Sequence, residues 1–336
     1  VVKAQLDHQA LHSQELLDPL RCYLAKAVAD ITPGDLQYCF FTNGGAESVE
    51  MSLKLARIAT CGRWYISTVG AFHGKSMGAI SMGGKSTYRT PYIPMVQHVQ
   101  YGVAEDIRKA IENLQAVGEK VAGVILEPIQ GEAGVIIPLD GYLTEVRKIC
   151  DETGVALIFD EIQTGMGRTG KWFAFQHAGI MPDVMTLAKA LGSGVPVGAL
   201  VCSEKTYGIF TPGNHGSTFG GNPLAMRAAK TTISIMEDEK LVENAAVMGE
   251  YLQKEFRKAL ADVPGFVEVR GRGLMIGIVL DRLAHGCLAL GLKHGVLFSV
   301  TAGNVIRIVP SLTIARRDAD ELVKRVTAVV REFTAA

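Results

Sequence analysis

Short apolar runs alternate with longer amphipathic stretches along most of the chain. Short apolar runs are typical of strands buried on both faces, and apolar positions at every third or fourth residue are typical of helices. This alternation predicts βαβ units, and therefore a mainly parallel sheet flanked by helices. The predicted strands are Tyr38–Thr42, Trp64–Thr68, Val121–Glu127, Val155–Asp160, Val184–Leu187 and Ala199–Cys202. The predicted helices are Ser48–Ala59, Glu105–Val117, Tyr142–Thr153 and the long stretch from Pro223 to Leu260.

After about Val263 the pattern changes to strand, strand, helix, strand and helix. These elements are predicted at Val267–Arg270, Leu274–Leu280, Leu283–His294, Val305–Val309 and Asp318–Phe333. We therefore predict two domains, a large α/β domain over residues 1–262 and a smaller α+β domain over residues 263–336. Open α/β sheets bind ligands at the carboxyl ends of their strands. Functional residues are therefore expected at that edge of the large domain.

The composition narrows the range of partners. The chain has 336 residues, 48% of them hydrophobic, and its 34 basic residues balance its 34 acidic ones. This balance does not favour nucleic acid or an anionic membrane as a partner, so small molecules and other protein chains are expected. No apolar run has the length of a membrane span and no leader opens the chain, so we expect a cytoplasmic protein. The histidines have no metal-binding spacing, and no metal is expected.

Two glycine-rich motifs resemble nucleotide-binding sites only in part. Gly165–Gly170 matches G-x-G-x-x-G, but the acidic Asp183 precedes the next strand instead of ending it, and aromatic residues follow where a crossover helix is needed. An NAD-dependent dehydrogenase is therefore kept only as an alternative of another class. Gly83–Thr87 resembles the end of a P-loop, but Ala79 stands where that motif needs its first glycine.

Another set of residues points to one chemistry. Asp160 and Glu161 end an apolar strand, and Lys189 follows the next one, where a desolvated lysine would have a lowered pKa and act as a nucleophile. Gly44 and Gly45 end the first strand and precede a helix, which can hold a phosphate by its N–H groups. A lysine for a Schiff base, an acid for the pyridine nitrogen and a phosphate cradle are what pyridoxal 5'-phosphate (PLP) requires.

At these residues the sequence resembles the class III aminotransferases of the ornithine and ω-amino acid type, over essentially its whole length. The blocks that carry this resemblance are Asn43–Glu50, Gly70–Gly74, Glu127–Glu132, Phe159–Gly170, Ala188–Gly192 and Gly216–Pro223. Within the family the chain looks most like putrescine aminotransferases, on Leu11–Leu20 and Lys85–Arg89. The resemblance implies the PLP-dependent transferase fold of type I. The N-terminal segment that helps to roof the substrate pocket in this family is expected to be missing here.

The resemblance also implies a role for each matching residue. Lys189 would hold PLP as a Schiff base and move the substrate proton, and Asp160 would keep the pyridine nitrogen protonated. Further cofactor contacts would come from Gln163 at the phenolic oxygen, Gly45 and Ala46 at the phosphate, Phe72 stacked on the ring, His73 beside it, and Thr218 from the neighbouring subunit. Arg307 would bind a substrate carboxylate, and Glu132 would neutralise Arg307 when the substrate has none.

These roles predict a ping-pong aminotransferase that works as a homodimer or a larger oligomer on small amine and keto or aldehyde substrates. The first choice is a terminal-amine donor such as putrescine with 2-oxoglutarate as acceptor. An acetylornithine or ornithine aminotransferase is the next alternative, because His215–Thr218 and Val305–Ile314 also suit that branch. A third is a secondary-metabolism transaminase, of the kind that forms the pyrrole of prodigiosin, aminating an aldehyde as part of a larger protein. A scaffold of this fold, kept only for oligomerisation, is a further alternative of another class.

Overall fold

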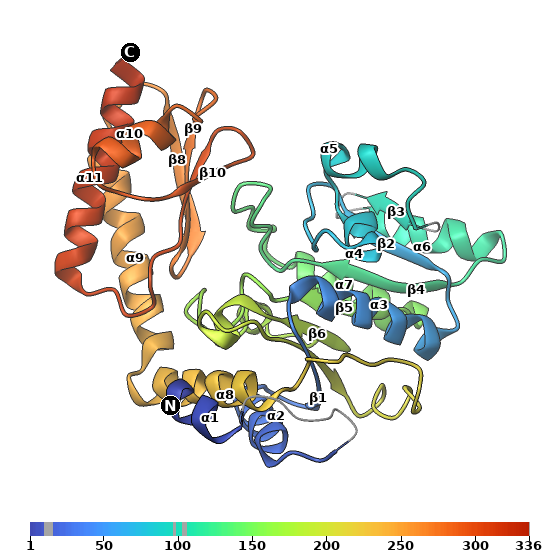
Figure 1. Ribbon diagram of the computed structural model, residues 1–336. Helices are drawn as coiled ribbons and strands as arrows, with labels where there is room; N and C mark the ends of the chain where they lie inside the picture. Colours follow the sequence, from blue (N-terminus) through green and yellow to red (C-terminus); the bar gives the residue numbers. More distant parts are fainter. Residues whose placement is uncertain (10–15, 97–98, 103–105, 336) are drawn as a thin grey trace. The chain divides into compact units, whose positions relative to one another are not determined.

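Residues 1–9, 16–96, 99–102 and 106–335 are described by the computed structural model of the chain. They form two compact units (Figure 1). The described residues within Val1–Pro128, Leu139–Gly165 and Ala174–Asp238 make up the large unit. Those within Ile129–Pro138, Met166–Phe173 and from Glu239 onward make up the small unit. The predicted domain boundary after residue 262 falls inside the small unit and stays a prediction.

A seven-stranded sheet forms the centre of the large unit, in the order β1-β7-β6-β5-β4-β2-β3. Strand β7 runs antiparallel to its neighbours β1 and β6, and the other six strands run parallel to one another. This confirms the mainly parallel α/β sheet predicted from the sequence. The strands are β1 (Leu36–Thr42), β2 (Trp64–Thr68), β3 (Val99–Gly102), β4 (Val121–Leu126), β5 (Ala156–Asp160), β6 (Val184–Leu187) and β7 (Gly198–Ser203). Only β3 was not predicted among them.

Helices flank this sheet, as predicted (Figure 1). Helix α3 (Gly45–Thr60) packs across β4, β6 and β7, α6 (Ile107–Ala116) contacts β2 to β4, and α7 (Tyr142–Thr153) contacts β5. Helix α8 (Pro223–Asp238) packs against α2 (Pro19–Ile31). Helices α1 (Val2–His8), α2, α4 (Met77–Met82) and α5 (Ser86–Arg89) were not predicted. A start signal exists for α2, because Asp18 Oδ1 accepts the Leu20 N–H at 2.8 Å and Pro19 opens the helix.

The small unit contains a four-stranded antiparallel sheet in the order β10-β11-β9-β8. Its strands are β8 (Phe266–Arg272), β9 (Met275–Leu280), β10 (Ser299–Thr301) and β11 (Val305–Ile308), and its helices are α9 (Leu241–Leu260), α10 (Cys287–Lys293) and α11 (Arg316–Ala335). The two kinds of element share one apolar core, to which α9 contributes Leu252 and Phe256, both fully buried. The predicted order of elements is confirmed, with β10 as an addition. The helical stretch from Pro223 to Leu260 is interrupted at Lys240, which has a left-handed backbone (φ 51°).

Two predictions touch residues outside the described ranges. These are residues 11–15 of the Leu11–Leu20 block and Glu105, the first residue of a predicted helix. Across the described ranges, no helix combines the length and the apolar character needed to cross a lipid bilayer.

Candidate active site

A cavity of about 420 Å³ opens at the carboxyl edge of the parallel strands in the large unit. Its volume lies within the range of roughly 300–1,000 Å³ that is usual for small-molecule and cofactor sites. Its walls come from the segments that follow β1, β2, β4, β5 and β6, and from the loop that enters β7. The lining residues are Asn43, Gly44, Gly45, Ala46, Phe72, His73, Gly74, Glu127, Asp160, Ile162, Gln163, Ala188, Lys189, Gly194, Val195, Pro196 and Val197. The cavity thus lies at the edge of the sheet where functional residues were expected.

Helix α3 begins at this cavity. Gly44 is its N-cap residue, and Gly45 and Ala46 open its first turn. The first N–H groups of a helix have no acceptor within the helix and, together with the helix dipole, attract an anion. Ser48 Oγ lies 3.2 Å from Gly44 O and 3.3 Å from Leu187 O, and so ties this turn to the end of β6.

Glycine at position 45 leaves room in this turn. A Cβ there would lie 2.8 Å from Cδ1 of Ile162, which is closer than real Cβ contacts come. Since Ile162 lines the cavity as well, a side chain at position 45 would have to displace the Ile162 side chain in the cavity wall.

Asp160 and His73 form a buried pair in the cavity wall. Asp160 is 4% exposed and His73 is 2% exposed. Nδ1 of His73 lies 2.8 Å from Oδ2 of Asp160, whose Oδ1 accepts the Ile162 N–H at 3.0 Å. The other ring nitrogen of His73, Nε2, is buried and has no hydrogen-bond partner in the described part of the chain. A buried polar atom without a partner costs about 1–3 kcal/mol, and a bound polar group would remove this cost.

Lys189 follows β6 and lines the same cavity. Its backbone has a φ of 45°, in the left-handed region that a residue with a side chain rarely adopts. Such conformations cost free energy and gather at functional sites. The residue is exposed in the single chain. Because Lys189 stands in the open wall of the cavity, its desolvation would have to come from whatever fills the cavity.

Glu161 does not reach the cavity, although it follows Asp160 directly. Successive side chains at a strand end point to opposite sides, and Glu161 turns into the core of the large unit, where it is 1% exposed. Its carboxylate accepts the Phe175 N–H at 2.9 Å and the hydroxyl of Thr164. Burial raises the pKa of Glu161 to about 7. Of the two acids taken together in the sequence, only Asp160 lines the cavity.

The remaining lining residues include some that were predicted and some that were missed. Phe72 and Gln163 line the cavity, as expected for cofactor contacts. Glu127 was expected only as part of a family block, yet it lines the cavity, is 9% exposed and accepts the Phe72 N–H at 2.9 Å. Its place at the end of a predicted strand was the signal that could have singled it out. The loop 194–197 was missed because its place depends on the direction of β7.

Three predicted residues are not in the lining of this cavity. Thr218 is exposed, and the hydroxyl of its neighbour Ser217 accepts a hydrogen bond of 3.0 Å from Asn43 Nδ2. Glu132 and Arg307 belong to the small unit. There, Arg307 Nη1 donates to Glu132 Oε1 at 2.9 Å, and the two side chains are 14% and 27% exposed.

The dinucleotide-type motif does not form a dinucleotide site. Gly165–Gly170 folds into turns, with Met166, Gly167 and Gly170 at positive φ. The short 3-10 helix Ala174–His177 follows, and no crossover helix opens on these glycines.

The donor groups of the cavity fit the PLP that the resemblance implies. Its phosphate suits the N–H groups at Gly45 and Ala46, its pyridine nitrogen suits the buried carboxylate of Asp160, and its aldehyde suits the amine of Lys189. All three groups line one cavity.

Comparisons with known proteins agree with this assignment. The profile of the aminotransferase class-III family matches residues 1–330. A thermostable (S)-enantioselective ω-transaminase from Thermomicrobium roseum is 31% identical, with a TM-score of 0.91 over 98% of this chain and 83% of that one. An ornithine aminotransferase from Toxoplasma gondii, with partial occupancy of PLP at its active site, is 29% identical (TM-score 0.92, 100% and 82%). An acetylornithine aminotransferase from Elizabethkingia anophelis is also 29% identical (TM-score 0.84, 99% and 83%).

Proposed function

The chain belongs to the class-III aminotransferase family and is a transaminase that uses PLP on a fold of type I, and from this premise we propose its donor and its acceptor. The donor is a terminal amine of the putrescine type, and the acceptor is a carbonyl compound such as 2-oxoglutarate. The observation that carries this proposal is the ion pair of Arg307 and Glu132, 2.9 Å apart. A guanidinium with its own removable counter-ion suits an enzyme whose two substrates differ by a carboxylate.

Lys189 and Asp160 carry the chemistry in this proposal. When bound, PLP supplies an electron sink for the carbanion at the amine-bearing carbon. Lys189 Nζ would hold the cofactor by a covalent bond; once the substrate amine has replaced it on the cofactor, the released Nζ would take the proton from that carbon. Asp160 would bind the pyridine nitrogen through its buried carboxylate, which His73 orients through Nδ1. The N–H groups of Gly45 and Ala46 would bind the phosphate, Phe72 would stack on the ring and Gln163 would donate to the phenolic oxygen.

Arg307 and Glu132 distinguish substrates that have a carboxylate at this position from those that do not. In the acceptor step, Arg307 releases Glu132 and binds the carboxylate of the acceptor, 2-oxoglutarate, with two parallel hydrogen bonds. In the donor step, Glu132 stays on Arg307, so that an amine without a carboxylate does not leave a partly buried cation without a counter-charge.

An ornithine or acetylornithine aminotransferase is the second candidate, because proteins of both names are among the similar structures. For either candidate we propose a homodimer, in which Thr218 serves the phosphate of the neighbouring subunit. The exposure of Thr218 in a single chain supports this role.

A substrate screen tests the proposal. Steady-state rates are measured for putrescine, ornithine, acetylornithine and a medium-chain aldehyde, with 2-oxoglutarate or glutamate as the second substrate. The highest kcat/KM is expected for putrescine. A clear preference for ornithine or acetylornithine would select the second candidate, and sedimentation of a fully active monomer would refute the role of Thr218.

A further inference from the structure

Two arginines of the small unit lie in one row across its sheet. Gly277 of β9 pairs with Arg270 of β8 on one side and with Arg307 of β11 on the other. Directly paired residues in antiparallel strands project to the same face of the sheet. The two guanidinium groups therefore lie on one face, and the glycine between them has no side chain to separate them.

The segment Ile129–Pro138, called here hairpin 129–138, packs onto this face. A Cβ on Gly277 would lie 3.2 Å from Cβ of Val135 and 3.0 Å from Cγ1 of Val305. Val135 also forms a buried apolar cluster with Ile129 and Met275. Glycine at position 277 thus lets the hairpin lie directly on the sheet, between the two arginines.

Each arginine holds a different part of this hairpin. Arg307 pairs with the carboxylate of Glu132. Arg270 donates to the carbonyl oxygen of Gly134, from Nε at 3.0 Å and from Nη2 at 2.7 Å. Two donors of one guanidinium on one acceptor fix both the distance and the direction of that carbonyl.

The tip of the hairpin needs such support. Val135 is fully buried and has a φ of 56°, and Gly134 has a φ of 105°. A positive φ is strongly disfavoured for a β-branched residue and persists only where the surroundings hold it. The two 3.0 Å hydrogen bonds between Gln130 and Ile136 close the base of the hairpin. At the tip, the two donors of Arg270 bind the carbonyl of Gly134, which follows Glu132 in the chain and precedes the buried Val135.

We propose that Arg270 is a positioning residue for the Glu132–Arg307 pair, and thereby sets the balance between carboxylate-bearing and carboxylate-free substrates. This inference rests on the substrate roles proposed above for Arg307 and Glu132. With the fork in place, Glu132 is held beside Arg307, which favours the amine and opposes the carboxylate acceptor. Without it, the tip relaxes, Glu132 leaves Arg307 more readily, and the preference shifts toward the acceptor.

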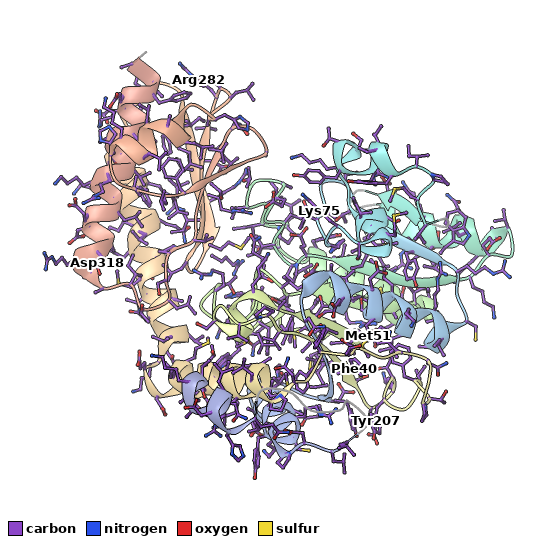
Figure 2. All side chains as sticks on the ribbon, in the orientation of Figure 1. Phe40, Met51, Lys75, Tyr207, Arg282 and Asp318 are labelled. Carbon is purple, nitrogen blue, oxygen red and sulfur yellow. The ribbon has the colours of Figure 1, made fainter. Side chains whose placement is uncertain are left out.

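The test compares Arg270→Lys, Arg270→Ala, Glu132→Gln and the double variant Arg270→Lys/Glu132→Gln in the PLP-loaded enzyme. Arg270→Lys keeps the charge and loses the fork. Arg282→Ala is the control, since Arg282 lies just beyond the end of β9 (Figure 2) and its side chain pairs with the adjacent Asp281. Two quantities are measured, the KM values for the amine and for the acceptor 2-oxoglutarate, and the Kd of glutarate, an inert dicarboxylate, by calorimetry.

Arg270→Lys is expected to lower both the Kd of glutarate and the KM for the 2-oxoglutarate acceptor by about fivefold and to raise the KM for the amine by a similar factor. A loss of stability alone would not move the two KM values in opposite directions, and thermal unfolding of Arg270→Ala reports on it separately. In the Glu132→Gln background, Arg270→Lys is expected to add nothing. Arg282→Ala should match the wild type.

Two results overturn the inference and can be told apart. If Glu132→Gln shifts the balance but Arg270→Lys does not, Arg270 has no positioning role and the proposed function stands. If Glu132→Gln itself leaves the Kd of glutarate unchanged, the proposed roles of Glu132 and Arg307 fail, and the inference falls with them.

Discussion

Nδ1 of His73 lies 2.8 Å from Oδ2 of Asp160, and both side chains are buried in the wall of one cavity. The strand end supplies the carboxylate, and the loop after β2 supplies the imidazole. The histidine thus fixes the orientation of the Asp160 carboxylate.

Asp160→Asn tests this arrangement. The amide cannot provide the negative charge that the pyridine nitrogen of PLP needs, so kcat is expected to fall by about a hundredfold or more. His73→Gln should cause a smaller loss, because the acid stays and only its orientation is disturbed. Steady-state kinetics and titration of the apoenzyme with PLP measure both effects. Wild-type kcat in Asp160→Asn would contradict the role of this carboxylate.

Lys189→Ala removes the amine that holds PLP. The visible absorption of the bound cofactor should disappear, and reduction with borohydride should no longer attach the cofactor to the protein. Turnover should fall by at least about a thousandfold. Lys205→Ala serves as a control, since Lys205 is exposed and is not in the lining of the cavity. Transamination near the wild-type rate in Lys189→Ala would refute the assignment.

Gly45→Ala narrows the phosphate end of the cavity. The new Cβ would lie 2.8 Å from Ile162 Cδ1, and overpacking of this kind costs about 1–3 kcal/mol. The Kd of PLP, measured by absorbance titration, is therefore expected to rise by about tenfold. The double variant Gly45→Ala/Ile162→Ala restores the space and should recover most of the affinity. If the second change brings no recovery, the contact with Ile162 is not the cause.

The burial of Glu161 predicts that the free energy of unfolding depends on pH. Burial raises its pKa from 4.5 to about 7 in the folded chain. Its contribution to stability is complete below the unfolded pKa and is lost as the pH rises through about 7, a change of roughly 3 kcal/mol. In urea unfolding between pH 5 and pH 8, Glu161→Gln should reduce the decline in the free energy of unfolding. The control Glu204→Gln, at an exposed position, should not. An unchanged slope in Glu161→Gln would show that this carboxyl does not titrate as its burial implies.

Much of the large unit could be predicted because its strands are buried on both faces. β2 and β6 are found at the predicted residues, and so is α7. The antiparallel direction of β7 could not be predicted, because strand direction depends on pairing partners far away in the sequence. For the same reason, the sequence could not show that the 194–197 loop, which leads into β7, lines the cavity.

The candidate site could be predicted at its strand ends. Asp160 ends β5, and Lys189 and the Gly44–Ala46 turn follow β6 and β1. The rule that parallel strands present their carboxyl ends together is enough to group them. No role was predicted for Glu161, and its burial away from the cavity follows from the rule that adjacent residues of a strand point to opposite sides. The exposure of Lys189 was not predictable, because it depends on the shape of the cavity mouth. The pairing of Arg307 with Glu132 was expected from the family resemblance. The place of Arg270 beside this pair required the register of three strands and a hairpin from another part of the chain.

The order of the segments along the chain has an evolutionary consequence. Hairpin 129–138 follows directly after Glu127, which lines the cofactor cavity, and precedes α7. An insertion or a deletion in this short connection would therefore alter a wall of that cavity and the counter-ion of Arg307 in one event. If Arg307 and Arg270 have the roles proposed above, donor preference in a lineage of such enzymes should change more readily by point substitution on β8 and β11 than by changes in the length of this connection.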